Sequence, residues 1–254
     1  MASLLSVENL QVQFQTKKGI NTAVDGVSFS VEKGRILGIV GESGCGKSVT
    51  SMSILQLLGS NARISGGSIK LDGKELIGLP EKEMCRIRGN DIAMIFQDPM
   101  TALNPTLTIG TQLMEPIMLH QNCGKKEAWT RAVDVLKRVG IAAPEKRMKE
   151  YPHQLSGGMR QRVMIAMAVS CEPRLLIADE PTTALDVTIQ AQILELMCEL
   201  REKMGTAIML ITHDMGVVAE TADDVLVLYA GKAVEYGSIE DILKDRSILT
   251  HRDF

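Results

Sequence analysis

The sequence has few aromatic residues and no long apolar run. Its 254 residues include one tryptophan, three tyrosines and four phenylalanines, against fifteen methionines. We therefore expect a core packed with flexible, adaptable side chains. No apolar run approaches the roughly 18–20 residues that cross a bilayer, and the first residues lack the basic start and apolar segment of a signal peptide. We expect the chain to stay in the cytosol.

The sequence also lacks a large net charge and a cysteine pattern typical of disulfides or zinc sites. The net charge at pH 7 is −3, so no overall basic surface indicates nucleic-acid binding. The five cysteines are odd in number and no two are spaced C-x-x-C, which argues against disulfides and a zinc site. With no internal repeat or low-complexity linker, the length suits one large domain or one domain with an inserted subdomain.

One glycine-rich segment fits the pattern G-x-x-x-x-G-K-[ST], and it reads Gly41-Glu42-Ser43-Gly44-Cys45-Gly46-Lys47-Ser48. It follows the apolar run 36–40 and opens a helix-like run 48–58, which is the strand–loop–helix order of phosphate-binding loops. Glycines let successive N–H groups point at one anion, and a helix N-terminus adds partial positive charge. Lys47 is expected to reach the β- and γ-phosphates, and the Ser48 hydroxyl to ligate Mg²⁺.

The spacing of apolar residues divides the chain into three parts. The first favours strands, at residues 4–14, 27–31, 35–40, 68–71 and 92–96. The middle, from about 108 to 170, favours helices, with Ala128, Ala132, Val135 and Val139 at helical spacing. The last alternates apolar strands with amphipathic helix, the strands at 175–178, 207–211 and 225–228. This alternation favours an α/β fold with a mostly parallel sheet covered on both faces.

Two carboxylates, Asp179 and Glu180, end the apolar strand at 175–178. Sites in parallel α/β sheets form at that end of the strands. Asp179 would complete the magnesium shell opposite Ser48, and Glu180 would polarise the attacking water as a general base. Taken alone, the pair could equally be a helix cap, and the phosphate loop favours the catalytic interpretation.

A second small-residue segment, Leu155-Ser156-Gly157-Gly158, precedes the helical run 163–169. At a helix N-terminus it would form another anion cradle, whereas by itself it could be a flexible turn. A chain with one nucleotide does not need two phosphate cradles. We therefore predict that Ser156 and Gly158 act on the nucleotide of another subunit.

In combination, these motifs resemble the nucleotide-binding subunit of an ABC transporter. They occur in the family's order, namely the phosphate loop, Gln97, Leu155–Gly158, Asp179–Glu180, Ala184-Leu185-Asp186 and His213. The resemblance implies a P-loop ATPase core at 1–97 and 172–254, with an N-terminal antiparallel β subdomain, and a helical subdomain carrying the signature segment at 98–171. It also implies a head-to-tail dimer in which each ATP lies between one subunit's Lys47 loop and the other's Ser156 segment.

The resemblance implies four further roles. Gln97 resembles the glutamine that senses magnesium and the attacking water, and His213 resembles the switch histidine that contacts the γ-phosphate. Asp186 resembles the residue that communicates across the dimer, and Phe14 sits where the family places a ring against adenine. Without the resemblance, Gln97 and His213 could be polar strand ends, and Phe14 could be a core residue.

A narrower resemblance is to the ATPases of dipeptide, oligopeptide and nickel importers, and it rests on residues 23–29, 96–105 and 211–219. It implies integral-membrane permeases, a second ATPase that is the same or a related chain, and an extracellular or periplasmic solute-binding protein as partners, with the ATPase on the cytoplasmic face of the membrane. Those ATPases usually continue into a longer, often cysteine-bearing extension, which we expect to be missing or altered here. Short-tailed nickel-importer ATPases keep that solute open beside peptides.

Two rival functions belong to other classes. A soluble ABC-type ATPase acting on DNA or ribosomes would usually carry two cassettes, coiled coils or basic surfaces, and the sequence has none of these. A regulatory module that binds ATP without hydrolysing it would not need Glu180 and His213.

Overall fold

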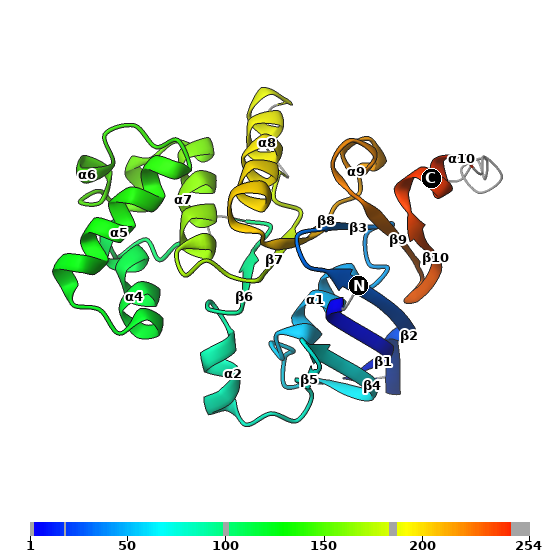
Figure 1. The fold of residues 1–254 in the computed structure, drawn as a ribbon. Coiled ribbons are helices and arrows are strands. Elements are labelled where there is room, and N and C mark those ends of the chain that lie inside the picture. The colour runs from blue at the N-terminus through cyan, green and yellow to red at the C-terminus, as the bar shows by residue number, and fades with distance from the viewer. Residues whose placement is uncertain (1–2, 18, 99–101, 183–186, 245–254) are drawn as a thin grey trace. The chain divides into compact units, whose positions relative to one another are not determined.

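The computed structural model describes residues 3–17, 19–98, 102–182 and 187–244. Strands and helices alternate along these ranges (Figure 1), and the predicted α/β class is confirmed. The chain forms two compact units. The first comprises residues 1–84 with 207–254, and the second comprises residues 85–206.

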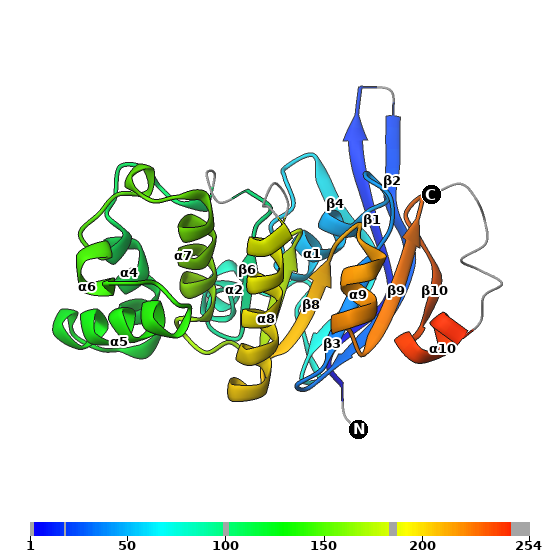
Figure 2. The ribbon, with the colours of Figure 1, turned by 90° about the horizontal axis from the view of Figure 1, so that it is seen from above.

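The first unit contains an antiparallel sheet in the order β2-β1-β4-β5. Its strands are β1 (Ser3–Thr16), β2 (Gly19–Glu32), β4 (Ala62–Leu71) and β5 (Lys74–Glu75). β1 and β2 form a long hairpin, drawn in blue in Figure 2. On β1, Leu10 and Val12 are buried whereas Gln11 between them is exposed, as expected for a sheet with one covered face.

The same unit holds a second set of strands in the order β10-β9-β3-β8. They are β3 (Ile36–Val40), β8 (Ala207–Ile211), β9 (Asp224–Tyr229) and β10 (Lys232–Ser238). β3 pairs in parallel with β8 and β9, and β10 is antiparallel to β9. Every residue of β3 and β8 is buried, because parallel strands are covered on both faces. The helices of this unit include α1 (Lys47–Ile54), α9 (Met215–Thr221) and α10 (Ile239–Lys244).

Gly38, in the middle of β3, lets α9 pack closely against the strand (Figure 2). A Cβ atom at Gly38 would lie 2.5 Å from Cγ1 of Val218, closer than Cβ atoms approach other atoms in proteins. The missing side chain therefore sets the distance between β3 and α9. This contact bears on the site, because β3 leads into the phosphate loop and α9 follows His213.

The second unit combines a pair of parallel strands, β6 (Ile92–Ile95) and β7 (Leu175–Asp179), with helices. Those helices are α4 (Ile109–Gln121), α5 (Lys125–Arg138), α6 (Pro144–Arg147), the 3₁₀ helix η1 (Pro152–Gln154), α7 (Gly157–Val169) and α8 (Val187–Met204). A further helix, α2 (Glu81–Ile87), spans the sequence boundary between the units. Contacts join α4, α5 and α7, the green elements of Figure 1. The apolar stripe predicted for α5 is confirmed, because Ala128, Ala132, Val135 and Val139 are buried.

The strands predicted from apolar runs are all present, most of them longer than predicted. The apolar pattern does not predict the start of β2 at Gly19 or any of β10, because polar residues interrupt it there. Backbone pairing with β1 and with β9 forms these strands. Within the described residues, no helix has both the length and the apolar character needed to cross a membrane. The functional division into 1–97, 98–171 and 172–254 stays a prediction.

Candidate nucleotide site

The glycine-rich segment forms a tight loop between β3 and α1. Gly41, Gly44 and Gly46 have φ angles of 152°, 82° and 107°, values that side chains other than glycine rarely adopt. A Cβ atom at Gly41 would lie 2.1 Å from the carbonyl oxygen of Leu228. Both the curl of the backbone and its close approach to β9 therefore require glycine here, and the curl is the shape that lets amide groups converge on an anion.

Lys47 folds back into this loop. Its Nζ donates hydrogen bonds to the carbonyl oxygens of Gly41 at 2.6 Å and Glu42 at 2.8 Å, and the residue is only 6% exposed. The buried Cys45 lies on the same side, with Sγ 3.8 Å from Nζ. The loop thus holds a compact cation at its centre, a suitable group for binding a phosphate as a point charge.

A turn between β9 and β10 supports the loop from behind. The Gly231 N–H donates to the Cys45 carbonyl at 3.0 Å, and the Gly231 carbonyl accepts from the Asp25 N–H at 2.7 Å. A Cβ atom at Gly231 would lie 2.7 Å from the Ala23 carbonyl oxygen. Gly231 is therefore a structural part of the site that the sequence patterns missed, because it lies almost 190 residues after the motif it supports.

His213 lies at the same edge of the first unit's parallel strands as the loop. Ile39 of β3 pairs with Ile211 of β8, and the Thr212 N–H donates to the Ile39 carbonyl at 3.1 Å. Gly41 and His213 thus each follow a paired residue by two positions. His213 is exposed, and Asp214 after it caps α9 by accepting from the N–H groups of Gly216 and Val217. The structure therefore brings the loop and His213 to one edge, as parallel strands require.

In the second unit the structure joins Gln97 to Glu180. Gln97 follows β6 and Glu180 follows β7, and the Gln97 Nε2 donates to the Glu180 Oε2 at 2.9 Å. Because the NH₂ end of the amide serves this bond, the amide oxygen of Gln97 is the end that can meet a cation. The neighbouring Asp179 is 6% exposed, and Glu180 has a left-handed φ of 46°.

The signature segment begins α7 at an exposed position. Ser156 is the N-cap residue, and its side chain accepts from the Met159 N–H at 3.4 Å. Ser156 and Gly157 are exposed, whereas Gly158 is half-buried, with a would-be Cβ 3.4 Å from Ile189. An uncovered helix N-terminus of this kind can meet a negative group from outside the chain.

Two other predicted site residues are Phe14 and Asp186. Phe14 is half-buried on β1, where it pairs with Asn21 of β2 and Ala62 of β4. Asp186 lies outside the described residues.

Ser43, Gly44 and Ser48 are exposed along the loop, so their polar groups face solvent or a ligand.

The oxygen donors of this chain fit magnesium. Ser48 of the first unit carries a hydroxyl and Asp179 of the second unit a carboxylate, and each is a hard oxygen donor of the kind that Mg²⁺ takes together with substrate phosphates and water. Among the described residues, no group of three or more His, Cys, Asp or Glu side chains is arranged to hold a metal ion without a substrate.

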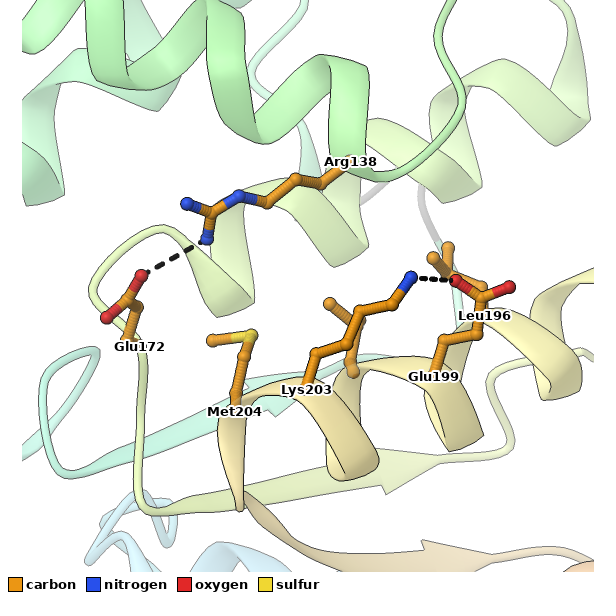
Figure 3. Close-up of a pocket in the computed structure, with 7 residues that line it drawn as sticks. Arg138, Glu172, Leu196, Glu199, Lys203 and Met204 are labelled. Carbon is orange, nitrogen blue, oxygen red and sulfur yellow. Dashed lines mark hydrogen bonds and ion pairs between the residues drawn. The ribbon is translucent and has the colours of Figure 1, made fainter.

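A pocket of about 480 Å³ lies elsewhere in the second unit, at the ends of α5 and α8 (Figure 3). Leu196, Leu200 and Met204 contribute apolar surface to it. Its charged groups are paired, Arg138 with Glu172 at 3.1 Å and Lys203 with Glu199 at 2.6 Å. The pocket holds none of the predicted site residues, and its paired charges leave no net charge for a phosphate.

Comparisons with known proteins decide the family. The family model described as ABC transporter matches residues 24–183. The chain belongs to the ABC transporter family. The cassette is 58% identical to the oligopeptide transport ATP-binding protein AppD of Bacillus subtilis, over 95% of the chain and 74% of the relative. It is 55% identical to the oligopeptide transport ATP-binding protein OppD of Escherichia coli, over 94% of the chain and 71% of the relative.

Solved structures give the same family. The cassette is similar to a dimeric post-hydrolysis state of the ATP-binding cassette MJ0796 bound to ADP and Pi, with a TM-score of 0.82 and 27% identity. That match covers 92% of this chain and 98% of the other. A second similar structure, cbiO1 from Clostridium perfringens, is part of an ABC transporter complex and has a TM-score of 0.81 at 27% identity, over 98% of this chain and 94% of the other. The predicted P-loop ATPase fold is therefore confirmed, and the cassette is an ATPase of this family.

Proposed function

We propose that the cassette is the ATP-hydrolysing subunit of a prokaryotic ABC importer for dipeptides or oligopeptides. The observation that carries the ATPase part is the glycine loop around the Lys47 ammonium, 2.6 Å from the Gly41 carbonyl. The solute class is supported by the peptide-transport relatives, at 55–58% identity over most of the chain. No feature of the described residues favours nickel.

The loop binds the ATP phosphates in this proposal. Backbone N–H groups from Gly41 to Ser48 surround the phosphates, and Lys47 exchanges its carbonyl partners for the β- and γ-phosphate oxygens. Phe14 stacks on adenine. Ser48, Asp179 and the amide oxygen of Gln97 would hold Mg²⁺. When bound, the ion neutralises charge on the β- and γ-phosphate oxygens.

Glu180 then acts as the general base toward the water that attacks the γ-phosphate in line. The amide of Gln97 orients the Glu180 carboxylate, and His213 contacts the γ-phosphate from the edge of β8. Lys47 stabilises the charge on the transferred group. The observed bond between Gln97 and Glu180 supports this assignment, because a base must be held in a fixed direction.

Two cassettes pair head to tail in this proposal. Ser156, Gly157 and Gly158 of one subunit complete the ATP site of the other, and Asp186 communicates across the interface. The exposed N-terminus of α7 and the dimeric MJ0796 structure support this arrangement. The remaining partners are permeases in the membrane, which place the ATPase on its cytoplasmic face, and a solute-binding protein outside.

The test of the hydrolytic role is Glu180→Gln. This variant keeps the size of the side chain and removes the base, so we expect ATP binding within about twofold of wild type and turnover reduced by about a hundredfold or more. Steady-state phosphate release and titration with a fluorescent ATP analogue measure the two quantities. Unchanged turnover would remove Glu180 from the mechanism, and absence of ATPase activity in the wild type would overturn the enzyme itself.

The test of the transport role is affinity purification from detergent-solubilised membranes of the source cells. Co-purification of multi-span permeases would support the importer. Whether one or two kinds of ATPase chain come with them would show whether the ATPase dimer is a homodimer or a heterodimer. The associated binding protein is then titrated with peptides and with Ni²⁺. Peptide binding supports the proposed solute, whereas Ni²⁺ binding or purely soluble partners would contradict it.

A further inference from the structure

Gln161 is a buried polar residue with no role in the function proposed so far. It lies on α7 and is only 2% exposed. Its Nε2 donates a hydrogen bond to the carbonyl oxygen of Pro181. A buried amide is costly unless it is hydrogen-bonded, so this bond holds Gln161 and the Pro181 carbonyl together.

Pro181 directly follows Glu180, whose backbone is in an unusual conformation. Glu180 has a φ of 46°, a left-handed value that costs a residue other than glycine about 1–3 kcal/mol. The residue before a proline normally prefers an extended conformation. Surrounding contacts must therefore stabilise this turn, and the Gln161 bond is one that reaches it from another element.

We propose that Gln161 is a positioning residue for Glu180, acting through the Pro181 carbonyl. The inference rests on the proposed function, in which Glu180 is the general base. By holding the turn, Gln161 keeps the Glu180 carboxylate in the direction in which Gln97 meets it at 2.9 Å. The bond also ties the base to α7, the helix that begins at the signature segment.

The first variant to test is Gln161→Met, which keeps the apolar volume and removes the donor. We expect kcat to fall by about tenfold to a hundredfold, since a shift near 1 Å at the reacting group costs about that much. The dissociation constant for ATP stays within about twofold, because the loop of the first unit is unaltered. Phosphate release and fluorescent-nucleotide titration measure both, with Tm recorded for each protein.

The matched control is Gln112→Met. Gln112 is a glutamine of the same unit that is 5% exposed, and its amide bonds go to Asn104 and Leu107 instead of the Glu180 turn. It should lower Tm at least as much as Gln161→Met while leaving kcat within about twofold of wild type. Equal losses of kcat in the two variants would reduce Gln161 to an ordinary core residue and overturn the proposal.

A second variant, Gln161→Glu, tests the donor itself. An ionised carboxylate cannot donate to the Pro181 carbonyl, whereas a protonated carboxyl can. Burial raises the pKa of such a carboxyl, so the ratio of variant to wild-type kcat should rise as pH falls from 8 to 6. A ratio that stays well below one and does not rise as pH falls to 6 would contradict the proposed role even if Gln161→Met fails to fold.

A double-mutant cycle separates this proposal from the proposed function. In the Glu180→Gln background, Gln161→Met should cause no further loss of single-turnover rate, because the base through which it acts is already gone. Fully additive losses of the single-turnover rate would mean that Gln161 does not act through Glu180. A wild type without ATPase activity would overturn the proposed function, whereas an active wild type matched by Gln161→Met would overturn only the inference about Gln161.

Discussion

The phosphate loop and the signature segment are both glycine-containing helix N-termini, yet they are built differently. In the loop, Gly41, Gly44 and Gly46 have left-handed φ angles, and Lys47 is buried among carbonyl groups. In the signature segment, Gly157 and Gly158 are already the first residues of α7, with an exposed serine cap. The loop is thus a complete cradle made within one unit, whereas the signature segment is an open half-site that needs a second surface.

The largest effect expected from this difference separates Gly41→Ala from Gly157→Ala. A methyl group at Gly41 would lie 2.1 Å from the Leu228 oxygen, whereas at Gly157 no heavy atom lies within 4 Å. We expect Gly41→Ala to lower ATP turnover by about a hundredfold through displacement of the loop, and to weaken binding of a fluorescent ATP analogue. Gly157→Ala should leave that binding within about twofold of wild type.

Both variants need circular dichroism and Tm as folding controls. Equal weakening of nucleotide binding by the two substitutions would contradict the contrast between a complete cradle and an open half-site. Normal binding with reduced turnover in Gly157→Ala would sharpen it, since the signature segment would then act only in the paired state.

This contrast also shows what the sequence could predict. The loop, the buried strands β3, β7 and β8, and the stripe of α5 depend on neighbouring residues, so local patterns identified them. The Gly231 turn and the bond from Gln161 to Pro181 depend on contacts between residues 20 to 206 positions apart. The residue types at both ends of such contacts are common in turns and helices, so nothing local distinguishes them.

The pairing of Gln97 with Glu180 lies between these cases. Each residue follows an apolar strand. The strand-end position of Glu180 predicted its role toward the attacking water, whereas the role of Gln97 came from the resemblance to ABC transporters. Their direct bond across 83 positions follows from the parallel register of β6 and β7, which the sequence does not specify. The contacts within the chain likewise do not show which partner the exposed signature segment meets.

A smaller effect is expected where β3 supports the loop. Gly38→Ala places a methyl group 2.5 Å from Val218 Cγ1, and such overpacking costs about 1–3 kcal/mol of unfolding free energy. Val218→Ala makes room for the methyl group, so the double variant should be more stable than the sum of the two single losses. Urea unfolding measures all three, with Gly157→Ala as a glycine substitution that meets no atoms. Strict additivity would mean that β3 and α9 are not coupled at this contact.

The smallest effect concerns Glu75, which lies in the first unit outside the phosphate loop. A substitution there should change the stability of the protein but not its binding of ATP. Burial alone would raise the pKa of this carboxyl, but hydrogen bonds from the Ser68 hydroxyl and the N–H groups of Ile69 and Ile77, with help from Lys70, lower the pKa below its usual value. Because the folded state favours the carboxylate, Glu75 stabilises the protein above the unfolded pKa of about 4.3. This contribution disappears as pH falls through the folded pKa.

Glu75→Gln should therefore lower Tm slightly at pH 7, and the difference from wild type should shrink as pH falls below about 4.3. ATP binding at pH 7 should not change. Differential scanning fluorimetry across pH 3–8 gives the comparison, and a Tm difference that does not vary with pH would exclude the carboxylate as its source.

The turn at Gly231 limits how this cassette can be engineered. Its two backbone hydrogen bonds, one to Cys45 and one from Asp25, mean that an inserted tag or a fused reporter there would displace the glycine-rich loop that we propose binds ATP. The tip of the β1–β2 hairpin offers the opposite case, because Gly19 has no neighbouring heavy atom within reach of an added Cβ and Ile20 is 58% exposed. A fluorophore or epitope placed beside Ile20 would therefore leave the glycine-rich loop at 41–48 in its native geometry.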